Sequence, residues 1–218
     1  MGVVVGRSKV VTTLGIVAAS QPLAAQAGAE MLRRGGNAVD AAIAANAVLG
    51  VVEPQSNGIG GDLFAIVSEP GSDHLHGLNA GGWSPSGLTP ALLRSLGHTD
   101  MPMTGIHSVT VPGAVAGWEM LRQRFGTLTM AELLAPAIFY ARDGFPVSEV
   151  IAGAWHGLTA KLTANREASR TYLPNGRAPS GRSFHECRAR RRAGADRGQR
   201  SAGVLRRRHS EGDDRVVS

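Results

Sequence analysis

Apolar residues recur at helical spacing in two consecutive stretches near the start of the chain. The first runs from Leu23 to Met31 in steps of four, with Ser20 as a candidate N-cap and glycines 35 and 36 as a candidate stop. Asn37 is a candidate N-cap for the second, and Asp40 lies in its first turn, where the helix dipole favours an acidic group. The pattern predicts two helices, ending near residues 35 and 50, that pack closely through alanines.

The pattern then changes to that of short strands. The apolar run LFAIV at 63–67 lies between segments rich in glycine and proline, and HLHGLNA follows it across EPGSD. These features predict two antiparallel strands. Further along, SVTV at 108–111 predicts a strand that leads through Pro112 and Gly113 into a helix, and Trp118 of this helix is expected to pack inside.

Capping residues predict three further helices. Thr89 opens the first, Thr129 forms a capping box with Glu132 at the start of the second, and Ser148 precedes the third, whose apolar stripe starts at Val150. Helical and strand periodicity both vanish after residue 179. The sequence therefore predicts an α+β domain over residues 1–179 and an irregular tail over 180–218.

Charge divides the chain at the same place. Up to Ser180, Lys and Arg number 12 and Asp and Glu number 12, whereas the last 38 residues carry 11 Arg against 5 acidic residues. The whole formal charge of +6 therefore belongs to the tail, and the body is neutral. With 43% hydrophobic but only 5% aromatic residues, the body is expected to build its core from small side chains.

Targeting signals are not evident in the sequence. The first twenty residues lack a charged region followed by an apolar one, and no run reaches the roughly 18 apolar residues of a membrane span. Cys187 is the single cysteine, so an intrachain disulfide is excluded. We expect a soluble, cytoplasmic protein.

The glycine-rich segment GIGGD, residues 58–62, has two interpretations. Backbone amides without side chains can close around a phosphate. A dinucleotide-binding loop, however, follows a strand and opens a helix, whereas this segment follows a helix and opens a strand. A tight turn that brings the backbone close to a ligand or another strand is favoured.

Histidine and cysteine supply two further candidate sites. His74 and His76 share one face of a predicted strand, a spacing that zinc or iron can use, but no third ligand lies nearby in the sequence, so solvated histidines are favoured. Cys187 with His185 is a conceivable thiolate pair, but no predicted element holds the two together. We expect no metal site and no complete active site.

Three blocks of sequence resemble, in order, the γ-glutamyltransferase family of glutathione hydrolases and cephalosporin acylases. They are ASQPLAAQAGAEMLRRGGNAVDAAIAANAVLGVVEPQSNGIGGDLF, then SVTVPGAVAGWEMLRQRFG, then AELLAPAIFYARDGFPVS. The resemblance covers roughly residues 6–179. It implies an N-terminal portion of an N-terminal-nucleophile (Ntn) hydrolase, an incomplete four-layer αββα sandwich.

The resemblance also implies a mechanism. Such enzymes are precursors that cut themselves into a large and a small subunit, and the new N-terminal Thr of the small subunit attacks the acyl donor with its own amino group as base. No metal or organic cofactor is implied. The Thr-Thr-His type of segment that carries this nucleophile is absent from the 218 residues, so no catalytic residue is assigned in this chain and we expect it to be inactive alone.

Substrate specificity is a second departure from the family pattern. In many members an Arg after the second strand binds the α-carboxylate of the γ-glutamyl group. Here the stretch reads GLNAGGWSPSGLTP, with Trp83 near that position. We expect Trp83 to contact substrate and the acyl group to be less polar than the γ-glutamyl group of glutathione.

The arginine-rich tail has two explanations. Arg outnumbers Lys by 10 to 2 up to Ser180, which suggests a GC-rich gene, and GC-rich codons read out of frame yield Arg, Ala and Gly, so a frameshift close to Ser180 is favoured. The alternative is a non-enzymatic interaction module whose basic arm binds nucleic acid or membrane. Acidic residues and the lack of interleaved aromatics count against that arm. The expected partners are therefore a small γ-glutamyl or acyl-amide substrate of the full-length enzyme and the small subunit that bears the Thr nucleophile, not nucleic acid or membrane.

Overall fold

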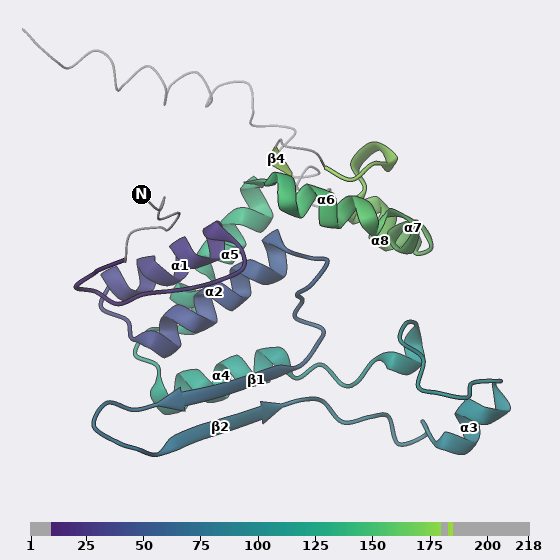
Figure 1. Ribbon diagram of the computed structural model, residues 1–218, viewed down its shortest axis with the longest axis horizontal. Helices are drawn as coiled ribbons and strands as arrows, with labels where there is room; N and C mark the ends of the chain where they lie inside the picture. The colour runs from purple at the N-terminus through teal and green to yellow at the C-terminus, as the bar shows by residue number, and fades with distance from the viewer. Residues whose placement is uncertain (1–9, 180–182, 185–218) are drawn as a thin grey trace, which may run out of the picture. The chain divides into compact units, whose positions relative to one another are not determined.

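The computed structural model describes residues 10–179 and 183–184, and it divides into two compact units, one up to Tyr140 and one from Ala141. Helices and short strands are mixed, which confirms the α+β prediction. The helices and strands of the first unit (Figure 1) are α1 (Pro22–Arg33), α2 (Ala38–Val52), β1 (Leu63–Ser68), β2 (Leu75–Ala80), α3 (Pro90–Ser95), the 3-10 turn η1 (Ile106–Ser108), α4 (Ala114–Phe125) and most of α5 (Met130–Asp143). Within the described ranges, no helix is long and apolar enough to cross a bilayer.

The start of α1 lies one residue later than predicted. The side chain of Gln21, not Ser20, caps the helix and accepts a hydrogen bond from the Leu23 amide at 2.5 Å. The Ser20 hydroxyl donates instead to the Glu53 carboxylate at 2.6 Å, at the far end of α2. The sequence prediction was wrong here because a partner 33 positions away captures the hydroxyl.

Helices α1 and α2 lie side by side and form the centre of the first unit (Figure 1). Gly28 permits this contact, since a Cβ at that position would lie 2.9 Å from the carbonyl oxygen of Ala41 on α2. The predicted close packing through small side chains is confirmed, and α2 continues to Val52, two residues beyond Gly50. The buried side chains of the pair include Ala24, Ala27, Met31, Ile43, Ala44 and Val48.

Asp40 ties this helical pair to the turn between α4 and α5. Asn37 and Asp40 form the capping box of α2, and the fully buried Asp40 carboxylate also accepts hydrogen bonds from the Thr127 hydroxyl at 2.6 Å and from the Thr127 and Leu128 amides at 3.1 and 3.2 Å. Burial alone would raise the pKa of Asp40, but these hydrogen bonds and the one from the Asn37 amide outweigh it and lower the pKa. The carboxylate is therefore a charged clamp between two segments.

The predicted caps of two later helices are present. The Thr89 side chain accepts from the Leu92 amide at 3.1 Å at the start of α3. At the start of α5, the Thr129 amide donates to Glu132 at 2.9 Å, and the Glu132 amide donates to Thr129 at 3.3 Å. Pro136 lies inside α5. These caps were predictable because both partners are within three residues of each other.

Strands β1 and β2 form the predicted antiparallel hairpin, with Leu63 opposite Ala80. One face of the hairpin packs on α4, where a Cβ at Gly117 would lie 2.5 Å from the Leu63 side chain. The strand predicted at 108–111 does not form. Residues 109–113 are irregular, and the Val111 amide instead donates to the carbonyl of Trp83 at 3.0 Å. The side chain of Trp118 on α4 is buried, as predicted.

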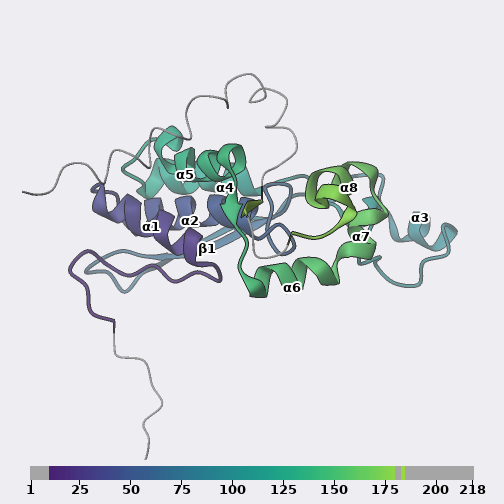
Figure 2. The same cartoon turned by 90° about the horizontal axis from the view of Figure 1, so that it is seen from above.

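The second unit continues with a short strand and three helices (Figure 2). Ser148 caps α6 as predicted, but Val150 is 80% exposed and the buried residues of α6 are Ile151 and Trp155. The predicted stripe was wrong by one position because the larger side chains, four residues apart, turn inward. Trp155 meets Tyr172 edge to face, with ring centroids 6.0 Å apart. The elements are β3 (Phe145–Pro146), α6 (Glu149–Gly157), α7 (Thr159–Thr163), α8 (Arg166–Tyr172), the 3-10 turn η2 (Pro174–Gly176) and β4 (Ser183–Phe184), which pairs with β3.

Candidate functional site

The glycine-rich segment 58–62 is a turn that holds the start of α4. The carbonyl oxygen of Gly61 accepts hydrogen bonds from the amides of Gly113 and Ala114, at 3.1 and 3.0 Å. Those amides would otherwise be available to bind an anion. The structure therefore agrees with the favoured interpretation, a turn that brings backbone segments together.

Asp62 follows this turn and joins it to two other segments. Its Oδ1 atom accepts from the Gly82 amide at 3.1 Å, just after β2, and from the Thr110 hydroxyl at 3.1 Å, just before α4. This role of Asp62 was not predictable from the sequence, because its partners lie 20 and 48 positions away. The only signal available was an acidic residue directly after a glycine turn.

Two glycines let the backbones meet at this point. A Cβ at Gly82 would lie 1.5 Å from the carbonyl oxygen of Val111, and one at Gly113 would lie 2.1 Å from the carbonyl oxygen of Ala80. Both obstacles are backbone atoms, which cannot move aside as a flexible side chain can. The segment after β2 is thus pressed against the segment before α4.

Trp83 projects from this junction. Its carbonyl is bound by the Val111 amide, but its side chain is 87% exposed. Between Asp62 and Val111 the only Lys or Arg is Arg94, so the segment next to Trp83 carries no cation for a carboxylate. The predicted contact between Trp83 and substrate is compatible with this exposure and stays a prediction.

The side chains of His74 and His76 contact each other and, for His76, two charged side chains. His74 is exposed, as expected, but the side chain of His76 is only 18% exposed. Arg124 donates to its Nδ1 at 3.0 Å, so Nε2 carries the proton that faces the Glu69 carboxylate at 2.6 Å. Within residues 10–179, no three His, Cys, Asp or Glu side chains are arranged to hold a metal ion.

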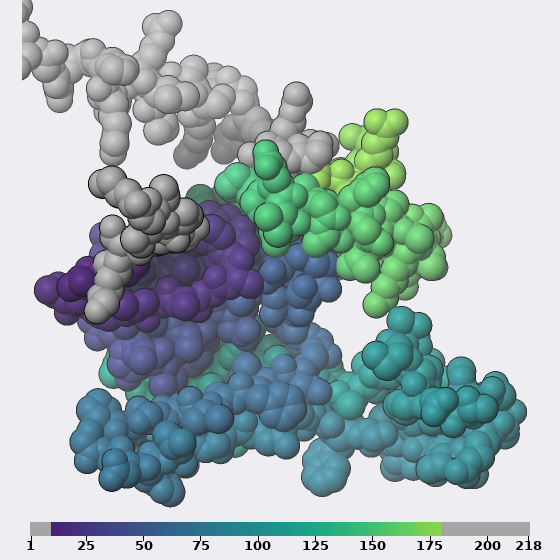
Figure 3. Space-filling view, in the orientation of Figure 1, coloured from purple at the N-terminus to yellow at the C-terminus, as the bar shows by residue number. Residues whose placement is uncertain are grey.

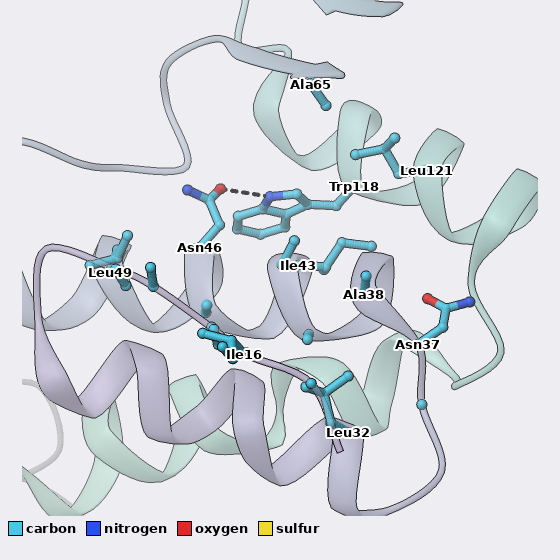
Figure 4. Close-up of a pocket in the computed structure, with 18 of the residues that line it drawn as sticks. Ile16, Leu32, Asn37, Ala38, Ile43, Asn46, Leu49, Ala65, Trp118 and Leu121 are labelled. Carbon is cyan, nitrogen blue, oxygen red and sulfur yellow. Dashed lines mark hydrogen bonds between the residues drawn. The ribbon is translucent and has the colours of Figure 1, made fainter. Parts of the chain in front are cut away.

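A large apolar hollow of about 720 Å³ lies beside α2 and β1 (Figure 4). It is lined by the segment 14–19, by small side chains of α2 and by Trp118 and Leu121 of α4. Asn46 is a polar residue at its wall, and its Oδ1 accepts from the Trp118 indole at 2.8 Å. Figure 3 shows the purple segment that precedes α1 on the outside of these helices. The hollow offers no nucleophile or base.

Nucleophilic chemistry is not assembled in the described part of the chain. Where a Ser or Thr hydroxyl donates a hydrogen bond within residues 10–179, its acceptor is a carboxylate or a backbone carbonyl and not an imidazole ring. Cys187 and His185 lie outside the described residues, as does the arginine-rich tail beyond residue 184. No catalytic residue is therefore assigned from the geometry.

Comparison with known proteins assigns the chain to a family. The gamma-glutamyltranspeptidase family profile matches residues 24–186. The chain belongs to this family. It is 36% identical over 166 residues to the glutathione hydrolase proenzyme of Bacillus subtilis (strain 168), a match that covers 74% of this chain and 28% of the relative.

Two solved structures agree with the family assignment. The Helicobacter pylori gamma-glutamyltranspeptidase superposes with a TM-score of 0.77 at 26% identity, over 84% of this chain and 54% of that one. The cephalosporin acylase of Bacillus halodurans superposes with a TM-score of 0.71 at 39% identity, over 84% of this chain and 37% of that one. The fold is thus that of a portion of an Ntn hydrolase, and the chain spans less than a third of the curated relative.

Proposed function

We propose that this chain forms the front part of the large subunit of a γ-glutamyltransferase-like acylase, an enzyme that transfers or hydrolyses an acyl group held in an amide. The match of the family profile over residues 24–186 carries the proposal. The chain contributes the α1–α2 layer and the loop of Trp83, and a small subunit contributes the Thr nucleophile. The 218 residues alone are inactive.

The reaction proceeds through an acyl-enzyme. The Thr hydroxyl of the small subunit attacks the amide carbonyl, its proton passes to the Thr amino group, and the leaving amine takes a proton as the C–N bond breaks. Water or an acceptor amine then takes up the acyl group and releases the Thr. In this scheme the residues described here bind and orient the substrate.

The acyl group that fits best is apolar. A γ-glutamyl group carries an α-carboxylate and an α-ammonium group, and a carboxylate is best bound by the paired donors of an Arg. Trp83 instead offers an exposed ring, and no Lys or Arg lies within ten residues of it along the chain. Apolar surface on the acyl chain gains from contact with this ring.

A fusion protein tests the proposal. Residues 10–179 would precede the part of the B. halodurans cephalosporin acylase that lies beyond the match, and both the fusion and the 218-residue chain would be assayed with γ-glutamyl and butyryl anilides. The butyryl group is the γ-glutamyl group without its two charges. We expect the fusion to cut itself into two chains and to prefer the butyryl anilide, and the chain alone to match a mock preparation.

Substitutions at Trp83 separate the parts of the proposal. Trp83→Arg should shift the preference of the fusion towards the γ-glutamyl anilide by a few-fold, because an ion pair at an exposed position contributes roughly 0.2–1 kcal/mol. Trp83→Phe, which keeps an aromatic ring, should leave the preference unchanged. Turnover by the 218-residue chain, or equal preference in all variants, would overturn the proposal.

A further inference from the structure

One carboxylate oxygen, Oδ1 of Asp62, joins the two ends of the loop that carries Trp83. We call this junction of Asp62, Gly82 and Thr110 the neck of the loop. The chain leaves the hairpin at Gly82 and returns at Thr110, and both residues donate to Oδ1 of Asp62 at 3.1 Å. Next to these bonds the Val111 amide donates to the Trp83 carbonyl at 3.0 Å. The two ends of an excursion over residues 84–109 are thus fastened to a single residue outside it.

Asp62 is itself held in a fixed frame. The preceding carbonyl, that of Gly61, binds the first amides of α4, and the following residue, Leu63, begins β1. Leu63 packs against Gly117 of α4. The Asp62 backbone is therefore positioned by a helix and a strand at once, which makes it a rigid support for a loop.

The excursion has little else to fix it. Its short helix α3 has no buried residue, and several of its apolar side chains are exposed, among them Leu96 at 51%, Met103 at 92% and Ile106 at 76%. Few buried contacts mean that such a segment opens at low free-energy cost. The position of Trp83 therefore depends on the neck and not on packing of the excursion.

We propose that Asp62 is the positioning residue of the Trp83 loop, and that its carboxylate fixes where the indole is presented to the acyl group. The assignment of an acyl group to Trp83 rests on the proposed function, whereas the positioning of Trp83 by Asp62 does not. Asp62 touches no substrate in this scheme and acts through Gly82, Trp83 and Thr110.

Trypsin digestion of the whole 218-residue chain tests the neck directly. Arg94 is the only Lys or Arg between Arg34 and Arg122, so cleavage inside the excursion gives one pair of fragments. Asp62→Ala should speed cleavage after Arg94 by about tenfold, the equivalent of about 1.4 kcal/mol, because two hydrogen bonds to a charged acceptor are lost. Asp62→Asn keeps an acceptor oxygen and should stay within about threefold of the wild type.

Two further variants keep the test decisive if Asp62→Ala fails to fold, which circular dichroism would show. Thr110→Val removes one of the two donors and should speed cleavage by a few-fold. Asp73→Ala removes an exposed carboxylate of the β1–β2 turn and should change nothing. Cleavage after Arg94 at the wild-type rate in folded Asp62→Ala, or in Thr110→Val, would overturn the inference.

The fluorescence of the Trp83 indole gives a second measurement, which a general loss of stability would not change. Trp118 and Trp155 are 4% and 1% exposed, so quenchable emission comes from Trp83 and can be assigned with Trp83→Phe. The anisotropy of this emission should decay faster in Asp62→Ala and recover in Asp62→Asn. If the neck opens but the fusion keeps its preference between the two anilides, the proposed role of Trp83 fails while that of Asp62 stands.

Discussion

Replacement of Asp40 tests whether one buried carboxylate holds the first unit together. In Asp40→Ala the amides of Asn37, Thr127 and Leu128 and the Thr127 hydroxyl all lose their acceptor. Hydrogen bonds to a charged group contribute about 1.5–3 kcal/mol each, but Thr127 is exposed and can turn to water. We therefore expect the free energy of unfolding to fall by about 3 kcal/mol, well below the sum of the bonds.

Asp40→Asn should cost nearly as much as Asp40→Ala. Each carboxylate oxygen accepts from at least two donors, so either orientation of the Asn amide turns its NH₂ group towards N–H groups. Asp73→Asn, at an exposed carboxylate, should stay within about 0.5 kcal/mol of the wild type. Urea unfolding followed by circular dichroism measures all three. A loss below about 1 kcal/mol in both Asp40 variants would refute the reasoning.

The same carboxylate predicts a pH dependence. Its pKa is lowered in the folded chain, so the stabilisation it gives is fully present above the pKa of the unfolded chain and is lost as the pH falls through the lowered, folded pKa. The difference in stability between the wild type and Asp40→Asn should therefore narrow as the solution is acidified below the ordinary range of an Asp. A difference that stays constant as the pH falls well below that range would contradict the assigned pKa shift.

Two further predictions concern the backbone junction and the tail. Gly113→Ala should destabilise the chain by about 2 kcal/mol or more, because its Cβ would meet the Ala80 carbonyl, whereas Gly153→Ala, with nothing within 4 Å, should be neutral or stabilising in thermal unfolding. We propose that the residues after Ser180 are read out of frame. Resequencing of the gene there should reveal a second reading frame that continues the family sequence. The chain should not bind duplex DNA at low salt. Tight binding that weakens steeply with salt would favour a functional basic arm.

Features with local causes were predictable from the sequence. The capping residues Asn37, Thr89, Thr129 and Ser148 act within three positions along the chain, and the hairpin follows from alternation and a short turn. The inward position of Trp118 was also predictable from its size and setting. The resemblance of three ordered blocks gave the family, which the profile match confirms.

Features that depend on distant partners were not predictable. Ser20 has an ideal capping side chain, but Glu53 binds it from 33 positions away and Gln21 takes the cap. Asp62 binds Gly82 and Thr110, which lie 20 and 48 positions further along the chain. No periodic pattern in the sequence predicts these two hydrogen bonds. The prediction of a strand at SVTV, residues 108–111, was wrong for the same reason. A segment with strand propensity forms a strand only where a neighbouring strand has free hydrogen-bonding groups.

One face of the β1–β2 hairpin is uncovered, as expected if this chain is part of a larger subunit. A two-stranded hairpin is marginal in water unless one face is covered, and here α4 covers only one. On the other face, Phe64 and Ile66 are 68% and 77% exposed, and the apolar hollow of about 720 Å³ lies beside the same strand. The relatives are much longer than this chain, so the additional segments of a family member are the natural cover for both surfaces, and the fusion should unfold at a higher temperature than the 218 residues alone.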